Sequence, residues 1–320
     1  MSALPQASAG SDIQAARVLH IPEERLDSAQ AKILSIADYR GEREALDTVV
    51  VEPYSPVVGA HVRGLDFGAS TPEHDAALAQ FLHDRLVRYG FLFFAPGIVR
   101  AEDFGRLVSL FGKARYAGTP YTPPPAGDTS VNTIDSSVKK TRMNLIWHID
   151  QAFVPEPPRF TALFGKAAPP TGGDTLFANA TAAYDLLDPD FARYLETLTA
   201  VHDVETQGFL TLAYQDPGAL AAQRAKYPPI EAPVIRVHPD TGRKQIFVSE
   251  LYTQRILGVP RTVSDHLLQI LFDYVKSPDV QTRVAWQEGA AVIWDNRVVQ
   301  HRGVADYGDG LRVLHRAIVQ

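Results

Sequence analysis

The chain of 320 residues contains no cysteine. Disulfide bonds, thiolate zinc sites, iron–sulfur clusters and a cysteine nucleophile are therefore excluded. No run approaches the roughly 18 consecutive apolar residues that a membrane-spanning helix needs. The first residues, MSALPQASAGSD, also lack the charged-then-apolar order of a signal peptide. We therefore expect a soluble, cytoplasmic protein that has no membrane partner.

An excess of positive charge is also missing, because the formal net charge is −6. Nucleic-acid binding relies on basic surfaces, so the composition gives no support for a nucleic-acid partner. Hydrophobic residues make up 45% of the chain, which is enough for a large core. Residues 1–47 begin with a small, polar stretch and show only short helical patterns. We predict that they form an N-terminal extension and that residues 48–320 form the folded domain.

From residue 48 onward, short apolar runs alternate with turn-forming residues, which predicts many strands and a few covering helices. A long loop is expected at 115–143, which is rich in proline, glycine, serine and threonine. The composition of segment 238–244, HPDTGRK, predicts a hairpin turn. The pattern indicates one mainly β domain with flanking helices, a sandwich or a barrel. Helices are expected near 72–89, 101–111, 181–197 and 263–276, and strands at 91–95, 233–237, 245–249, 282–287, 290–295 and 311–319.

Segment 144–150, NLIWHID, places a histidine and an aspartate two residues apart in an apolar run. The surrounding isoleucines and tryptophan favour a buried strand. Side chains alternate along a strand, so His148 and Asp150 are predicted to point to the same face. A buried carboxylate beside an imidazole needs a partner that offsets the lost hydration. That partner is either another side chain in a hydrogen-bonded pair or a metal ion.

A metal ion would need a third ligand, and His301 is the informative candidate among the ten histidines. It follows an apolar strand that is expected to end at Trp294, at a junction between strand and loop. Two histidines and one carboxylate are the facial triad of non-haem Fe(II) oxygenases. Zinc accepts the same ligands. A zinc hydrolase and an inactive binding module on the same barrel therefore stay open as alternatives.

Two arginines, Arg312 and Arg316, lie in the strand-like segment LRVLHRAIV. Their spacing of four predicts that both side chains share one strand face. Guanidinium groups that point inward from an apolar strand require anions, and they pair bidentately with carboxylates or sulfonates. Two structural salt bridges are the alternative explanation.

Five segments together resemble the taurine dioxygenase / 2,4-D dioxygenase (TauD/TfdA) family of Fe(II)- and 2-oxoglutarate-dependent dioxygenases. They are WHID, PPTGGDTLFANATAAYDLL, HPDTGRKQIFVSELYTQRI, IWDNRVVQH and ADYGDGLRVLHRAIV. They occur in the order and at the spacing of that family, across residues 48–320. The resemblance implies a double-stranded β-helix, or jelly roll, with helices packed outside.

The resemblance also implies site residues and cofactors. The implied cofactors are Fe(II), 2-oxoglutarate and O2, and the implied iron ligands are His148, Asp150 and His301. The implied cosubstrate contacts are Thr175, Arg312, Arg316 and Asn144. The implied substrate contacts are Gln151, Tyr252, Arg316, Tyr116 and Tyr121.

The implied reaction is oxidation of a small anionic organic substrate, most often hydroxylation, with release of succinate and CO2. Desaturation, or C–N oxidation of an amino-acid derivative in a biosynthetic pathway, is the alternative outcome. Taurine-specific relatives carry a histidine in the loop that here reads YAGTPYTPPPAGDTS, which has none, so taurine is not the expected substrate. Family members often form dimers or tetramers, which implies a homo-oligomer.

Overall fold

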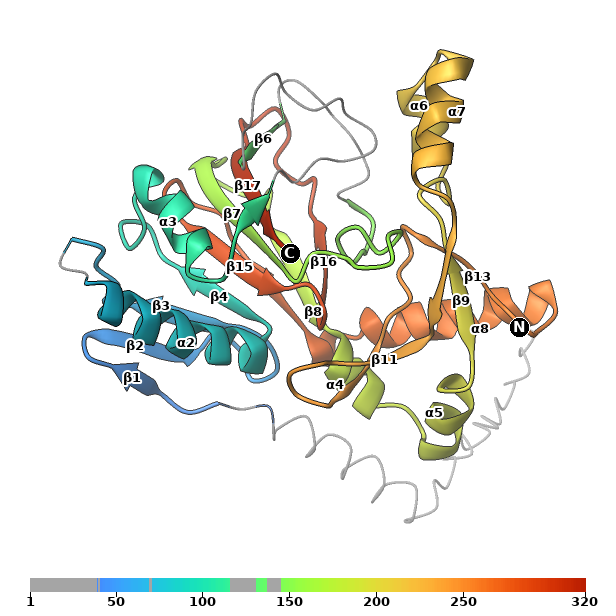
Figure 1. Ribbon diagram of the computed structural model, residues 1–320, viewed down its shortest axis with the longest axis horizontal. Helices are drawn as coiled ribbons and strands as arrows, with labels where there is room; N and C mark the ends of the chain where they lie inside the picture. The colour runs from blue at the N-terminus through green and yellow to red at the C-terminus, as the bar shows by residue number, and fades with distance from the viewer. Residues whose placement is uncertain (1–38, 40, 69–70, 116–130, 137–144) are drawn as a thin grey trace, which may run out of the picture.

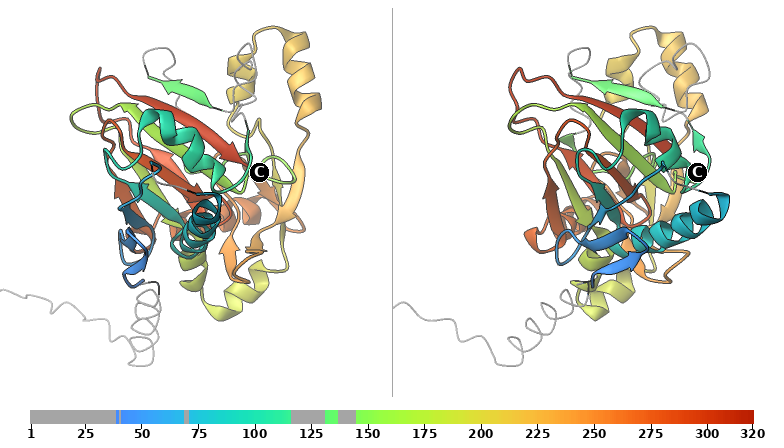
Figure 2. Two further views of the ribbon diagram at one scale, coloured as in Figure 1. Left: turned by 60° about the vertical axis from the view of Figure 1, so that its left-hand side comes forward. Right: turned by 90° about the vertical axis from the view of Figure 1, so that its left-hand side faces the viewer.

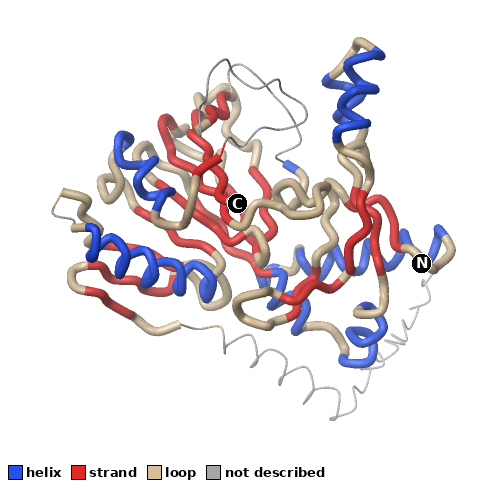
Figure 3. Tube along the Cα trace, viewed as in Figure 1, coloured by secondary structure: helices blue, strands red, loops and turns tan. Residues whose placement is uncertain are grey.

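The computed structural model describes residues 39, 41–68, 71–115, 131–136 and 145–320 (Figure 1). Two β-sheets form the centre, and helices lie outside them (Figure 3). The smaller sheet has the order β14 (Gln281–Val284), β8 (Thr175–Asn179), β16 (Val299–Gly303). The larger sheet has the order β1 (Glu44–Leu46), β2 (Val49–Pro53), β3 (Ala60–Arg63), β4 (Phe91–Phe94), β15 (Ala291–Asp295), β7 (Phe160–Ala167), β17 (Val313–Val319), β5 (Ala114–Arg115), and β6 (Asn132–Asp135) also pairs with β17.

The remaining elements lie around this centre, and α6 and α7 project away from it in Figures 1 and 2. A third sheet has the order β10 (Ile230–Pro233), β9 (Thr199–His202), β13 (Thr253–Ile256), and a hairpin joins β11 (Ile235–Val237) to β12 (Lys244–Ile246). The helices are α2 (Pro72–Tyr89), η1 (Ala101–Asp103), α3 (Phe104–Ser109), α4 (Ala180–Asp185), α5 (Pro189–Leu195), α6 (Phe209–Ala213), α7 (Pro217–Lys226), α8 (Arg261–Val275) and η3 (Pro278–Val280). None of the helices in the described ranges is long and apolar enough to cross a membrane.

Strand β15 shows how the large sheet is buried on both faces. Val292 and Trp294 belong to the core between the two sheets, whereas Ile293 belongs to the core under α2 and α3. Phe177 of the small sheet closes the first core, because its ring centroid lies 4.8 Å from that of Phe91 and 5.5 Å from that of Trp294. Strands buried on both faces carry continuous apolar runs, which explains AAVIWD and FLFF in the sequence.

Helix α2 covers the outer face of the large sheet. It begins after Thr71, whose hydroxyl accepts a hydrogen bond from the His74 backbone N–H at 3.2 Å. It ends at Gly90, which has φ +82° and donates its N–H to Leu86 O. A capping threonine and a left-handed glycine are the signals that predicted this helix, and the prediction is confirmed.

The mainly β fold with flanking helices is confirmed, but several local predictions were wrong. Residues 145–150, the described part of segment 144–150, do not form a strand, because His148 forms only an isolated bridge to His301. His301 lies inside β16 and not at a junction between strand and loop. The helix expected at 181–197 is divided into α4 and α5, since Pro189 cannot continue a helix and Asp188 caps a new one.

The boundary predicted between residues 47 and 48 stays a prediction. Strand β1 at Glu44–Leu46 already pairs with β2, so the sheet includes the last residues of the predicted extension. The predicted loop 115–143 contains the end of β5 and the whole of β6, and residues 116–130 and 137–143 lie outside the described ranges.

Candidate metal and cosubstrate site

His148, Asp150 and His301 converge between the two sheets. Their ligand atoms all lie within 4.8 Å of one another, and all three side chains are buried. The two histidine backbones exchange hydrogen bonds of 3.1 and 3.0 Å, and their ring centroids lie 4.2 Å apart. This is the one group of potential metal ligands found in the described part of the chain. The structure therefore brings together the three residues that the sequence had singled out.

Asp150 is placed by a side chain from far along the sequence and not by a strand ladder. Asn296, directly after β15, accepts the Asp150 backbone N–H at 2.8 Å and donates to the Asp150 carbonyl at 2.8 Å. Its amide also donates to Pro158 O at 3.1 Å. The next residue, Gln151, has φ +54°, a conformation that costs free energy for a non-glycine residue and is often found at functional sites. Sequence reasoning did not find this clamp on Asp150.

Both oxygens of the Asp150 carboxylate are engaged. Oδ1 lies 2.5 Å from the Arg316 guanidinium, and Oδ2 accepts the Thr161 hydroxyl at 2.8 Å. Burial alone would raise the pKa of Asp150, but Arg316, the two imidazoles and the Thr161 hydroxyl together hold it below its usual value. Burial also lowers the pKa of both histidines, so the triad presents one carboxylate and two neutral imidazoles.

This donor set fits a divalent metal ion. Neutral imidazoles and an ionised carboxylate are the forms that bind metal, so no proton must be lost first. His301 Nδ1 is shielded from solvent and has no hydrogen-bond partner among the described residues. The combination of two histidines and one carboxylate suits Fe(II). We therefore regard His148, Asp150 and His301 as the residues able to hold the metal.

A second polar cluster is formed by Thr175 at the start of β8, Arg312 directly before β17 and Trp286 after β14. Thr175 is opposite Gly303 in the β8–β16 ladder, and Phe177 is opposite His301, so the Thr175 and His301 side chains share the interior face. Thr175 Oγ1 accepts from Trp286 Nε1 at 2.9 Å and from Arg312 Nη2 at 3.5 Å. A hydroxyl has two acceptor lone pairs and one donor, so both lone pairs are used and the O–H needs an acceptor.

Arg312 has no carboxylate within ion-pair distance in the described ranges, while burial lowers its pKa. A desolvated guanidinium next to a donating hydroxyl forms a binding site for an anion. The cluster therefore suits one carboxylate of a dicarboxylic acid.

The turn before β8 holds Arg312 in place. The Arg312 Nε–H donates to Gly173 O at 2.7 Å, and the Gly173 N–H donates to Asp306 Oδ1 at 2.8 Å. Arg283 pairs with Asp306 at 2.7 Å and also contacts Asp174. A side chain at Gly172 would place its Cβ 2.6 Å from Asp306 Oδ1, which explains the glycine there. Asp306 and Arg283 were missed by sequence reasoning.

The structure describes some of the predicted substrate contacts and leaves others outside the described residues. Tyr252 is buried, and its ring centroid lies 6.4 Å from that of His148, as a pocket wall would. Gln151 is half-buried beside the metal ligands. Arg316 pairs with Asp150, which is a salt bridge of the kind that the sequence had left open as the alternative explanation. Three predicted contacts lie outside the described residues: Asn144, Tyr116 and Tyr121.

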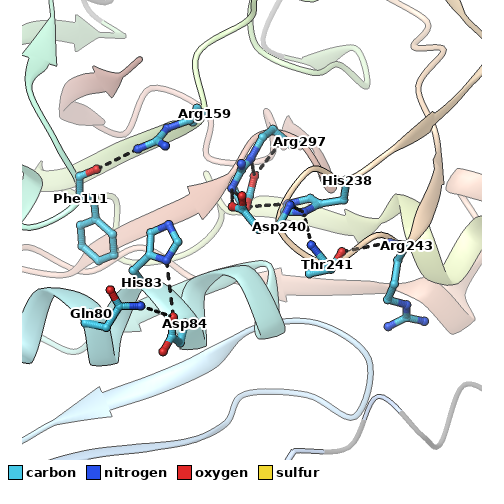
Figure 4. Close-up of polar contacts among 11 residues, drawn as sticks. Gln80, His83, Asp84, Phe111, Arg159, His238, Asp240, Thr241, Arg243 and Arg297 are labelled. Carbon is cyan, nitrogen blue, oxygen red and sulfur yellow. Dashed lines mark hydrogen bonds and ion pairs between the residues drawn. The ribbon is translucent and has the colours of Figure 1, made fainter.

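A largely buried polar network fixes the end of β15. His238 Nε2 lies 3.0 Å from Asp295 Oδ2, and Arg297 contacts Asp295 at 2.7 Å and Asp240 at 2.8 Å. Figure 4 labels three of these residues, His238, Arg297 and Asp240. Burial would raise the pKa of Asp295, but His238 and Arg297 hold it below its usual value. Asp295 immediately precedes Asn296, so the network supports the clamp on Asp150.

Comparisons with known proteins agree with this geometry. The profile of the family described as "Taurine catabolism dioxygenase TauD, TfdA family" matches residues 51–318. An alkylsulfatase of Acinetobacter baylyi is 35% identical over 268 residues, 81% of each chain. An alpha-ketoglutarate-dependent sulfate ester dioxygenase of Pseudomonas putida is 31% identical over 272 residues, 83% of this chain and 87% of that protein. The crystal structure of AAD-2 with Mn(II) and N-oxalylglycine has a TM-score of 0.70 and 25% identity, covering 85% of this chain and 97% of that chain.

These matches select among the alternatives that the residues had left open. A zinc hydrolase gives the cluster of Thr175 and Arg312 no role, and an inactive binding module does not need a complete metal triad. Dependence on alpha-ketoglutarate (2-oxoglutarate), which the name of the Pseudomonas putida relative states, accounts for both the triad and the cluster. The fold, the metal triad and the similarity over most of the chain all lead to one assignment. The chain belongs to the TauD/TfdA family and is a 2-oxoglutarate-dependent dioxygenase.

Proposed function

We propose that His148, Asp150 and His301 hold Fe(II), and that Thr175 and Arg312 bind the carboxylate of 2-oxoglutarate that lies away from the metal. The observation that carries this assignment is the unmet hydrogen-bonding capacity of the second cluster. The Thr175 hydroxyl must donate, and the Arg312 guanidinium lacks a carboxylate among the described residues. A carboxylate accepts from both groups at once. Trp286 fixes the direction of the hydroxyl by using one of its lone pairs.

The other residues of the site exclude water and orient the metal ligands. Phe177 and Trp294 pack against the His301 ring, with centroids 6.1 and 4.6 Å away, and so exclude water from that side. Thr161 and Asn296 fix the carboxylate and the backbone of Asp150. When bound, iron and 2-oxoglutarate supply the oxidising chemistry with O2 and release succinate and CO2. The chain itself supplies position, electrostatics and exclusion of water.

The substrate in this proposal is a small organic anion that becomes hydroxylated. Metal binding would draw on the Asp150 carboxylate that Arg316 contacts, which leaves the Arg316 guanidinium able to meet an anionic group of the substrate. Organic sulfate esters are the first candidates, because two relatives are described as acting on sulfate esters or alkyl sulfates.

The test begins with the cofactors. Fe(II) and then 2-oxoglutarate are added to the protein without oxygen, and the visible spectrum is recorded. A weak charge-transfer band is expected for the parent protein and for His266→Ala, an exposed histidine on α8, and no band is expected for His148→Ala. Absence of the band despite measured metal binding would contradict the site assignment.

The substrate class is tested by O2-dependent succinate release with hexyl sulfate, hexanesulfonate, a phenoxyacetate and uncharged hexanol. At least one anion is expected to stimulate release well above hexanol. Equal stimulation by hexanol would contradict the anionic substrate and leave the cofactor assignment intact.

A further inference from the structure

Strand β6 carries an asparagine whose side-chain oxygen is buried without a partner. Asn132 Oδ1 is shielded from solvent and accepts no hydrogen bond from any residue that the structure describes. Native proteins satisfy nearly all buried polar atoms, and each exception calls for an explanation. The oxygen can only accept, so its missing partner is an N–H or O–H group.

The pairing of β6 shows where this side chain points. β6 runs antiparallel to β17, with Asn132 opposite Arg316 and Ile134 opposite Leu314. Directly opposed residues in an antiparallel pair project to the same face. Leu314 lies in the core between the sheets and Ile134 packs against that core. The pair of Asn132 and Arg316 therefore also faces the interior.

The position of Arg316 locates Asn132 relative to the chemistry. The Arg316 guanidinium reaches Asp150 Oδ1, at the metal triad. Opposed side chains have Cβ atoms roughly 5 Å apart, so Asn132 and Arg316 leave the sheet side by side, on the face from which Arg316 reaches Asp150. Thr133, the next residue of β6, is exposed and lies on the other face.

We infer that Asn132 is a specificity-determining residue that accepts a hydrogen bond from the substrate close to its anionic group. This inference rests on the proposed function, because it takes Arg316 as the anion partner. The substrate class becomes narrower: a small anion with a hydroxyl, amine or amide N–H near its charged end. A substrate with only hydrocarbon there leaves the Asn132 oxygen unpaired in the complex, and sites of this kind discriminate against such analogues.

A role for Asn132 in holding Arg316 predicts a different pattern. No hydrogen bond joins the two side chains in the structure, since the guanidinium is directed to Asp150. If Asn132 only positioned Arg316, its loss would weaken every anionic substrate by the same factor. Substrates that differ only in the hydrogen-bond donor therefore distinguish the two roles: recognition of that donor by Asn132, and positioning of Arg316 by Asn132.

The test uses Asn132→Leu, which keeps the size of the side chain and removes its polarity, with Thr133→Val as the control on the outer face. Dissociation constants are measured by calorimetry without oxygen on the protein loaded with Mn(II) and 2-oxoglutarate. The ligands are matched pairs of anions, hexyl sulfate with 2-hydroxyhexyl sulfate and 2-acetoxyhexanoate with N-acetylnorleucine. Hexanol and hexane-1,2-diol serve as uncharged controls, and thermal unfolding confirms that each variant folds.

The parent protein and Thr133→Val are expected to bind the donor-bearing member of at least one pair about tenfold more tightly, and Asn132→Leu is expected to lose that preference. Three results would overturn the inference: no preference in the parent protein, a preference that survives in Asn132→Leu, or an equal loss for both members of a pair. A panel in which no donor-bearing anion binds also rejects this substrate class. Binding of the uncharged controls as tightly as the anions would instead refute the proposed anion site.

Discussion

Replacing Asn296 by alanine should destabilise the fold and weaken the metal site together. The amide makes three hydrogen bonds, accepting from Asp150 N and donating to Asp150 O and Pro158 O, with distances of 2.8, 2.8 and 3.1 Å. Asn296 is 2% exposed, so water cannot readily replace these bonds. At roughly 1–2 kcal/mol for each of the three buried groups left unpaired, the free energy of unfolding should fall by about 3–6 kcal/mol.

The loss of metal affinity follows from the position of the clamp. Two of the three hydrogen bonds hold the backbone of Asp150, which is a metal ligand in our proposal. Losing an outer partner of a metal ligand costs about 10- to 100-fold in metal affinity. Asn296→Asp provides a second probe, because it keeps the acceptor for Asp150 N but turns a carboxylate oxygen towards two carbonyls. It should be at least as damaging as the alanine variant.

Urea unfolding and calorimetric titration with Mn(II) measure the two effects. The control is Gln80→Ala on α2, where an exposed amide bonds to Asp84 at 2.7 Å (Figure 4). Substitution of such a surface group should change stability by less than about 0.5 kcal/mol. If Asn296→Ala is no more destabilising than this control and binds Mn(II) like the parent protein, the clamp reasoning is refuted.

Three further outcomes follow from the described contacts. Gln151→Gly should raise the free energy of unfolding by about 0.5–1 kcal/mol, because glycine adopts φ +54° without strain; urea unfolding checks this, and a loss of stability would contradict it. Asp306→Ala should raise the KM for 2-oxoglutarate about five- to tenfold, because it releases the Gly173 turn that holds Arg312. The KM of Asp306→Asn should lie between those of the alanine variant and the parent protein. An unchanged KM in both variants would exclude a role of this turn in cosubstrate binding. Burial, with a smaller effect of Arg236, lowers the pKa of His202 to about 4, below its unfolded value of about 6.5, so stability should fall by about 2 kcal/mol as the pH drops from 7 to 5. His202→Gln should flatten that pH dependence, and an unchanged pH dependence would show that His202 is not its source.

The strongest sequence predictions concern features that neighbouring residues decide. Thr71 and Gly90 mark the ends of α2 because capping and left-handed glycine are local properties of the backbone. The apolar runs FLFF and AAVIWD predict buried strands because the large sheet is covered on both faces. The helix break at Pro189 could also have been read locally, and it was missed because the apolar pattern continues across it.

The sequence by itself determined the ligand types of the candidate site and the strand-rich architecture. Tertiary structure decided how these parts act together. Asp150 is not placed by the strand that its neighbours predicted, but by Asn296, 146 residues further along the chain. Arg316 pairs with Asp150, and Asn132 faces the interior only because β6 adds to the edge of β17. Contacts of this kind depend on how segments distant in the sequence pack against each other, and short-range patterns of hydrophobicity and charge carry no information about that packing.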